Sequence, residues 1–443
     1  MIEESVAAAE TGGSPMQRVL RLRDFRLLWL GQATSLLGDQ FHFIALSWLV
    51  LQLTGDPLAL GLVLALAGIP RAIFTLVGGA VTDRFSPRAV MLISDIVRLV
   101  LTALLAMLVL TGTLQVWMLY GFSFVFGFVS GFFMPAAMAI LPAIVPEKDL
   151  QGGNALEQGT AQIVGIVGPV LAGGLIAWFS GAGQGDHADQ SAIGIALVVD
   201  ALTFVVSVAT LWLIRPRPAP HTDAGATRQS VWQSMKIGLR YAWERPILRM
   251  MLILISALNV LIVGPLVVGI PVLADTRLAE GAAAFGIIMA AFSGGNLIGI
   301  VVAGMVRTYR GTGALTLLLV IVFGAGTIAM GFITTTWAGA AIMLVMGLGN
   351  GFLSIRLITY LQLRTPADLL GRIMSLILFA NVGLAPLSQA AAGALSKASL
   401  TWLFVGVGLA MFGVAAWLVT QPALRTIDRE MGEMPVSAAD PSV

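Results

Sequence analysis

The sequence predicts an all-α polytopic membrane protein with twelve transmembrane helices arranged as two six-helix repeats. Hydrophobic residues make up 58% of the 443 residues and charged residues only 11%, and the mean hydropathy is +0.92. Soluble globular domains contain about 25% charged residues. The apolar residues form continuous runs near the roughly 20 residues that a helix needs to cross a bilayer. These runs lack the alternation that is typical of membrane β-barrel strands.

Each predicted span is bounded by a polar turn. Thr-Gly-Asp-Pro at 54–57 separates the first two runs, and Thr-Gly-Thr at 111–113 separates the third from the fourth. Clusters of Gly, Pro, Asp and Thr of this kind mark turns. The predicted spans are 26–53, 58–82, 89–111, 115–140, 155–179, 190–214, 247–274, 283–306, 313–334, 337–362, 371–395 and 399–420.

The distribution of basic residues predicts the orientation. With the N-terminus inside, the inner segments hold 20 of the 25 Lys and Arg residues, the outer loops hold only Arg277 and Lys397, and three lie within spans. Because short loops rich in Lys and Arg stay in the cytoplasm, we expect both termini there. The acidic first residues and the basic cluster before the first span differ from a cleaved signal peptide.

The longest polar interruption divides the chain in two. It begins with three closely spaced prolines and ends in a predicted amphipathic helix at 231–244, where Trp and Leu recur at helical spacing against Lys, Arg and Glu. The predicted organisation is a cytoplasmic N-terminal segment (1–25), an N-terminal six-helix bundle (26–214), a cytoplasmic linker with the amphipathic helix (215–246), a C-terminal six-helix bundle (247–420) and a cytoplasmic tail (421–443).

The two halves repeat each other. The run 146–152 before the fifth span resembles the run 366–371 before the eleventh, and Asp39 in the first span has the same offset as Asn259 in the seventh. Parallel repeats around a midplane site are typical of transporters. We therefore expect a central cavity, although channel-like or purely structural halves remain alternatives.

The tight turn between the second and third spans carries the first motif. It reads Gly-x-x-x-Asp-Arg-x-x-x-Arg from residue 79 to 88. An acidic–basic pair, Asp95 and Arg98, lies near it in the third span. The spacing resembles the signature that the major facilitator superfamily carries in this loop, which implies a cytoplasmic gate made of paired charges. The predicted gate residues are Gly79, Asp83, Arg84, Arg88, Asp95 and Arg98.

The fifth span carries a second motif. Gly165, Gly168, Pro169 and Gly173 recur every three or four residues, and such a row of glycines gives a smooth helix face for close packing while the proline bends the helix. The pattern resembles the antiporter motif of major facilitator exporters. Ordinary close packing of two membrane helices is the alternative.

Three further stretches narrow the resemblance. They are Asp200-Ala-Leu-Thr-Phe204, Gly238-Leu-Arg-Tyr-Ala-Trp-Glu-Arg-Pro246 and Gly371-Arg-Ile-Met-Ser375. Together they resemble the third drug:proton antiporter branch of the superfamily, which includes macrolide-efflux proteins and is similar to the enterobactin exporters. The resemblance extends over the chain apart from its tails, and it implies the major facilitator fold with proton-coupled export.

Ionisable residues inside spans are expensive and are therefore candidates for proton coupling. Asp39 lies near the middle of the first span, and His42 projects from the same helix face one turn later. In the family that the chain resembles, the first span lines the cavity, so Asp39 is the leading candidate. Asp200, in the sixth span, is a further candidate, for which a structural hydrogen bond to the third span or the linker is the alternative. The alternative for Asp39 is a hydrogen bond to a bent helix beside Gly38.

Several other residues are candidates for lining a substrate cavity. The fourth span is rich in Phe and Met, whose adaptable apolar side chains suit varied lipophilic molecules, although lipid contact and packing explain most of them. An arginine in the second span is expected to reach a carboxylate such as Asp39 or a helix end. One in the tenth span either attracts an anionic group or pairs across the inner gate. The predicted cavity residues are Asn259, Arg356, Phe124, Phe128, Met134 and Arg71.

Other kinds of chemistry find no support in the sequence. It holds no cysteine, its three histidines are scattered, and no phosphate-binding Gly-Lys-Ser/Thr loop occurs. We therefore expect no metal, no cofactor and no enzymatic activity, with transport driven by an ion or substrate gradient.

The sequence thus predicts a proton-coupled exporter of amphipathic small molecules or drugs, acting by alternating access. It is expected in the inner cell membrane, as a monomer, with protons, lipid and a small-molecule substrate as partners and no nucleic acid. One alternative is a dedicated siderophore or lysolipid exporter. Another is a non-transporting membrane sensor with the same fold.

Overall fold

The computed structural model describes residues 14–82, 85–182, 188–215, 231–306, 311–424 and 426. Within these ranges the chain forms helices joined by short turns, without strands. Twelve helical segments are long and apolar enough to cross a membrane, which confirms the predicted number and the all-α fold class.

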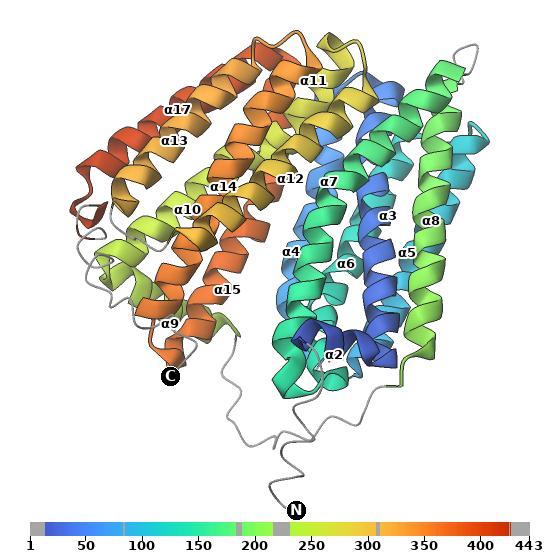
Figure 1. Cartoon of the computed structure of the whole chain (residues 1–443). Helices are drawn as coiled ribbons and strands as arrows, with labels where there is room; N and C mark the ends of the chain where they lie inside the picture. The colour runs from blue at the N-terminus through green and yellow to red at the C-terminus, as the bar shows by residue number, and fades with distance from the viewer. Residues whose placement is uncertain are drawn as a thin grey trace, which may run out of the picture. The chain divides into compact units, whose positions relative to one another are not determined.

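The first half contains α2 to α8 (Figure 1). The bounds are α2 Pro15–Arg21, α3 Arg23–Thr54, α4 Pro57–Thr82, α5 Pro87–Leu110, α6 Val116–Ile144, the short helix η1 Glu147–Asp149, α7 Leu150–Ala182 and α8 Ala188–Leu213.

The second half contains α9 to α17. The bounds are α9 Val231–Glu244, α10 Pro246–Gly264, η2 Pro265–Gly269, α11 Ile270–Arg277, α12 Ala282–Met305, α13 Thr312–Met330, α14 Thr336–Arg364, α15 Ala367–Gly383, α16 Ala385–Ala398 and α17 Leu400–Thr420. Helix α9 covers the range in which the sequence predicted an amphipathic helix.

Helix ends follow local sequence signals. The turns predicted at 54–57 and 111–113 are confirmed, because α3 ends at Thr54 and α5 ends at Leu110. The Ser86 hydroxyl accepts a hydrogen bond from the backbone N–H of Ala89 at the start of α5. Such a cap satisfies one of the N–H groups that the first turn leaves unpaired, which matters because the membrane core offers no water to replace it.

The chain divides into two compact units. One comprises Met1–Leu46 with Pro70–Ala226, and the other comprises Ser47–Ile69 with Thr227–Val443. The segment 47–69, which the sequence assigned to the N-terminal bundle, therefore packs with the second unit. The chain returns to the first unit at Pro70, inside α4. There the missing N–H and the bulky ring of proline weaken the helix.

In the first unit, α5 packs along α8 and α2 packs against α7. Buried side chains from α2, α3, α5, α6 and α8 form the core at the end where α2 lies. The side chain of Arg18 in α2 forms an ion pair with Asp149 in η1, with 2.7 Å between Nη2 and Oδ1. This pair and the core fix α2 to the start of α7.

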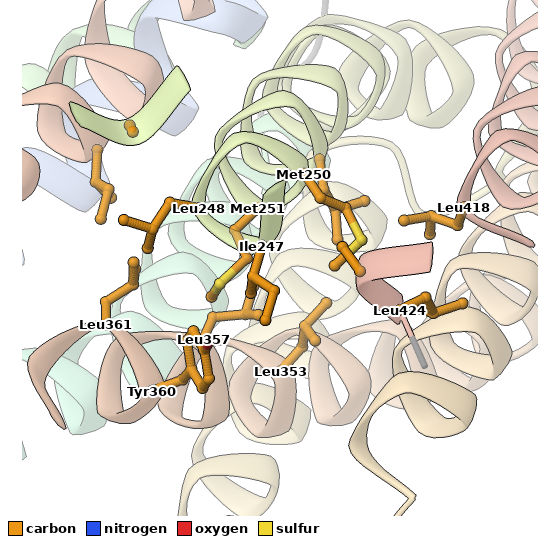
Figure 2. Close-up of a cluster of buried hydrophobic side chains, with 14 of the residues drawn as sticks. Ile247, Leu248, Met250, Met251, Leu353, Leu357, Tyr360, Leu361, Leu418 and Leu424 are labelled. Carbon is orange, nitrogen blue, oxygen red and sulfur yellow. The ribbon is translucent and has the colours of Figure 1, made fainter. Parts of the chain in front are cut away.

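In the second unit, α12 packs along α14, α13 along α17 and α10 along α16. One end of this unit is filled by the first turns of α10 against α14 and α17 (Figure 2). Met251 in α10 and Leu357 in α14 are buried there. The buried face of α10 therefore points toward α14, while α15 and α16 pack against its other faces.

Spans seven and eleven are interrupted, although the sequence predicted continuous helices at 247–274 and 371–395. The seventh opens into a π-helical turn at Pro265–Gly269 between α10 and α11, and the eleventh breaks at Leu384 between α15 and α16. The physical reason is proline, which cannot donate to the preceding turn. Ser388 bridges the two breaks: its hydroxyl donates to the Val260 carbonyl and accepts from the Gly264 N–H, at 2.6 and 2.7 Å.

Candidate functional site

Asp200 and His42 meet where α3 crosses α8. His42 Nδ1 lies 2.9 Å from Asp200 Oδ2, and the His42 ring stacks on Phe126 of α6 at 4.4 Å between centroids. Gly38, one turn before His42, permits this approach, because a Cβ at that position would lie 2.6 Å from Asp200 Oδ1. The structure therefore joins two predicted coupling residues from spans one and six.

Arg98 in α5 links two further carboxylates. Its guanidinium forms a hydrogen-bonded ion pair with Asp95, and its Nη1 lies 3.8 Å from Asp39 Oδ1. The Ser207 hydroxyl of α8 donates to the second Asp95 oxygen at 2.5 Å. Arg98 thus lies between a fully enclosed carboxylate and Asp39.

Aromatic rings enclose the arginine. The guanidinium carbon of Arg98 lies 4.2 Å from the centroid of the Phe133 ring and 4.8 Å from that of Phe204, where the negative ring faces stabilise a cation. We call Asp39, His42, Asp95, Arg98 and Asp200 the charge cluster.

The five members differ in exposure. The Asp95 and Asp200 side chains are fully buried and that of Arg98 is 4% exposed, whereas the side chain of Asp39 is 41% exposed. The charge cluster therefore has one open end, formed by Asp39.

The predicted gate residues separate into groups. Asp83 and Arg84 lie outside the described residues, and Gly79 lies in the last turns of α4. Arg88 donates to the carbonyls of Leu211 and Trp212 at 2.7 and 2.6 Å. These carbonyls end α8, where a cation complements the helix dipole.

The predicted antiporter motif lies on α7, facing the first span. Gly168 is buried, and a Cβ there would lie 2.6 Å from Cγ of Gln40, the neighbour of Asp39. Pro169 and Gly173 are also buried, while Gly165 is half-buried. The motif thus lets α7 pack closely against α3 at the level of Asp39.

The sequence reasoning missed Glu157 on α7. Its carboxylate is half-buried, and its Oε1 has no hydrogen-bond partner within the described part of the chain. One turn away, the Thr160 hydroxyl accepts a hydrogen bond from the Trp29 indole of α3 at 2.8 Å. An acidic residue within the fifth span was the sequence signal that could have identified it.

Asn259 has a partner that the sequence did not indicate. Its amide nitrogen donates to Asn381 Oδ1 of α15 at 2.8 Å and to the Ile255 carbonyl at 2.9 Å. Asn381 lies about one helical turn before the break at Leu384, and Asn259 lies within two turns of the π-helical segment that begins at Pro265. Interrupted membrane helices commonly carry binding groups of transporters.

Arg356 and Arg71, both predicted cavity residues, have different surroundings. Arg356 in α14 is 5% exposed and donates to the carbonyl of Val306, which ends α12, at 3.0 Å. Arg71 follows Pro70 in α4; it is exposed and lies within electrostatic range of Asp39.

The predicted aromatic and Met residues of α6 are partly open. The Phe128 ring contacts the Phe74 ring of α4, with centroids 4.4 Å apart and an angle of 68°. Phe124 and Met134 are exposed. Phe128 therefore packs α6 against α4, while Phe124 and Met134 present apolar surface.

Within the second unit, the turn between α3 and α4 makes polar contacts with α11 and α16. Lys397 Nζ of α16 donates to Asp56 Oδ2 at 2.7 Å, and Gln52 Nε2 donates to Asp275 Oδ1 of α11 at 2.9 Å. We call these four residues, together with Gly61 and Gly393, the turn cluster. A pocket of about 570 Å³ opens beside the ion pair and is also lined by Arg277.

The ion pair predicts a dependence on pH. The hydrogen bond from Lys397, with a second from the backbone N–H of Leu58, lowers the pKa of Asp56 below its usual range. A carboxyl group whose pKa is lowered in the folded protein stabilises the fold at pH values above its pKa in the unfolded chain, about 3.9 for Asp. This stabilisation is lost as the pH falls through the lower pKa of the folded protein. The pair is partly exposed, so its contribution is about 0.2–1 kcal/mol.

We therefore expect Lys397→Gln to lower thermal stability by the same small amount at pH 6 and pH 8. The difference from the unchanged protein should shrink as the pH falls below roughly 4 and disappear once Asp56 is protonated in the folded form as well. Melting curves at four pH values measure it. A difference that grows with acidity would contradict the assignment.

Comparison with known families decides what this helical bundle is. The profile of the Major Facilitator Superfamily matches residues 28–388. The chain belongs to this superfamily. The match begins in α3 and ends in α16, so it includes the charge cluster, the breaks in spans seven and eleven and most of the turn cluster.

Superfamily relatives include drug-efflux proteins. The chain is 24% identical to the multidrug efflux pump Tap of Mycolicibacterium fortuitum, over 91% of this chain and 96% of the relative. It is 25% identical to macrolide efflux protein A of Streptococcus pyogenes, over 43% and 44% of the two chains. The protein is thus a multi-pass superfamily transporter with efflux-pump relatives.

Solved structures share the superfamily fold. The nucleoside transporter NupG gives a TM-score of 0.68 at 12% identity, covering 90% of this chain and 98% of that one. A bacterial homologue of the lysosomal transporter Spinster gives 0.63 at 15% identity, over 95% and 98%. At these identities the likeness concerns the fold.

Proposed function

We propose that this transporter exports amphipathic small molecules in exchange for protons. The charge balance of the cluster supports this proposal. Three carboxylates face one arginine and one histidine. Even with His42 charged, these five residues keep one excess negative charge, which Arg71 approaches electrostatically without a hydrogen bond or ion pair to Asp39 in the described residues. A charge inside a membrane protein is costly unless it is neutralised.

Asp39 is the residue at which we place the exchanging proton. Its side chain is 41% exposed and reaches Arg98 only at 3.8 Å, whereas Asp95 binds both Arg98 and Ser207. When Asp39 is charged, it shares the guanidinium with Asp95. When it carries a proton, Arg98 belongs to Asp95 alone, and the open end of the cluster is neutral.

His42 and Asp200 form a second, enclosed pair that we assign to positioning. The Asp200 side chain is fully buried and that of His42 is 13% exposed, so a proton reaches them less readily than Asp39. Their hydrogen bond ties α3 to α8 and holds Asp39, one turn away on α3, near Arg98.

The orientation and location are part of the same proposal. Twenty basic residues against two favour cytoplasmic termini in a cell membrane. The turn cluster then lies at the outer surface and the start of α10 at the inner one. Protons entering from outside would drive export toward that side.

The experiment that tests the proposal compares the unchanged protein with Asp39→Asn in energised everted vesicles, with ethidium and erythromycin as probes. We expect probe addition to release protons from vesicles that contain the unchanged protein. The Asn variant should lose at least nine-tenths of this signal, because the amide cannot take up a proton.

Asp24→Asn is the matched control, because Asp24 is a half-buried carboxylate at the start of the same helix, beside Arg23 and outside the charge cluster. It should retain proton release. Equal release from both variants would remove Asp39 from the coupling step and leave Asp200 as the next candidate. No release with any probe would favour a dedicated siderophore or lysolipid exporter, which a panel of those compounds would identify.

A further inference from the structure

An apolar groove of about 670 Å³ runs along the seam between α10 and α15 under α9. One wall is the face of α10 that points away from α14, the other is α15, and the α9 side chains Leu239 and Trp243 close one end. Ser256 is the only residue with a polar side chain among the described residues that line it.

The groove extends deep into the bilayer. It follows α10 from Leu252 to Leu261, while the span itself begins at Pro246. At 1.5 Å per residue, Leu261 lies about 22 Å from the start of the helix, whereas one leaflet of the hydrocarbon core is about 15 Å deep. A long hydrocarbon chain entering beside α9 would therefore have an apolar lining along its length.

Basic side chains gather at the entrance. Arg245 ends the turn between α9 and α10 and is exposed, with its guanidinium over the Tyr241 ring. Arg249 lies one turn later and is half-buried; it shares a helix face with Leu252 and Ile253, which line the groove. Arg240 and Lys236 on α9 are exposed, and Glu244 pairs with Arg240. The entrance carries net positive charge.

The α9 side chains suit a membrane surface. Trp243 is 54% exposed and Leu239 46% exposed, although both line the apolar groove. Indole rings favour the boundary between headgroups and hydrocarbon, and an amphipathic helix with a basic polar face lies in that boundary. Figure 1 shows α9 beside α15 at the end of the second unit where α10 begins.

We propose that this groove is a binding site for an anionic phospholipid, with one acyl chain along α10 and α15 and the phosphate at Arg245 and Arg249. Charge complementarity favours an anionic headgroup over a neutral one, because basic residues near a membrane surface attract acidic lipids. The residues of this site belong to the second unit, whereas those of the charge cluster belong to the first.

The test measures retained lipid by native mass spectrometry. The purified full chain is equilibrated with equal amounts of phosphatidylglycerol and phosphatidylethanolamine. We expect the unchanged protein to retain phosphatidylglycerol preferentially, and the double variant Arg245→Gln, Arg249→Gln to bind it roughly tenfold more weakly. The control is Arg21→Gln, Arg26→Gln, which removes two exposed charges near the start of α3 and should keep the preference.

A second variant tests the groove itself. Ala257→Phe places a ring inside it and should reduce phosphatidylglycerol retention while leaving both arginines in place. Equal retention of both lipids by the unchanged protein, or an unaltered preference in the Arg245, Arg249 variant, would overturn the proposal. Displacement of the lipid by ethidium or erythromycin at transport concentrations would also overturn it, since the groove would then belong to the transported molecule.

Discussion

Replacing Arg98 with glutamine is expected to lower the free energy of unfolding by about 3–5 kcal/mol, because removing one partner of a buried ion pair leaves the other charge uncompensated. Arg98 is 4% exposed and Asp95 fully buried, and the same guanidinium lies 3.8 Å from Asp39. The variant would also lose the contacts with the Phe133 and Phe204 rings. Thermal unfolding in detergent, with the unchanged protein alongside, measures the loss.

The double variant Arg98→Gln, Asp95→Asn separates charge from packing. If the uncompensated Asp95 carboxylate causes the loss, neutralising it should restore much of the stability. The control is Arg240→Gln, whose side chain is 84% exposed and pairs with Glu244; exposed pairs contribute about 0–1 kcal/mol. An Arg98 variant as stable as this control would show that Asp95 and Asp39 do not depend on the arginine.

Prediction from sequence was most successful where hydrophobicity alone decides. Twelve apolar runs became twelve spans, and α9 occupies Val231–Glu244 as predicted. The same reasoning did not identify the interruptions near Pro265 and Pro386. A proline leaves an apolar run apolar, although it removes a helical hydrogen bond. Hydropathy therefore does not indicate the interruptions of spans seven and eleven.

The charge cluster was predictable in its members and not in its pairing. Asp39, His42, Asp95, Arg98 and Asp200 were all singled out as ionisable residues inside spans. Their partners depend on which helices touch, and helices α3, α5 and α8 are far apart in sequence. In the described residues Arg98 and Asp95 contact Asp39 and Ser207, whereas Asp83 and Arg84 of the predicted gate lie outside these residues.

Asn381 shows the same limit. Asparagine carries no charge, so a search for ionisable residues inside spans does not identify Asn381. Its hydrogen bond with the Asn259 amide, at 2.8 Å, is what connects it to the site. Local repeats identified Asn259 by its offset from Asp39, whereas the second member of the pair required the packing of α10 against α15.

Gly393→Leu is expected to separate α4 from α16 at the turn cluster. Gly393 and Gly61 face each other, and a Cβ at Gly393 would lie 2.8 Å from the Pro57 carbonyl oxygen and 3.0 Å from the Gly61 Cα. Both obstacles are backbone, so the side chain cannot be accommodated by a rotamer change. Helices with larger side chains pack about 8–10 Å apart, and overpacking costs about 1–3 kcal/mol.

The separation can be measured directly, because the chain has no cysteine. Spin labels on Leu62→Cys in α4 and Leu395→Cys in α16, both exposed in the structure, should report a mean distance longer by about 2 Å or more in the Gly393→Leu background. Gly406→Leu in α17 is the matched control, since a Cβ there meets no atom within 4 Å.

The same variant bears on transport. Alternating access, which the sequence predicts, would require α4 and α16 to part and rejoin at the turn cluster during the cycle. A penalty of about 1–3 kcal/mol on their contact would then reduce the joined state roughly 5- to 150-fold. Probe-driven proton release should fall with it, although the charge cluster is untouched. Longer label distances with undiminished proton release would show that the turn cluster holds α4 and α16 together but has no part in transport.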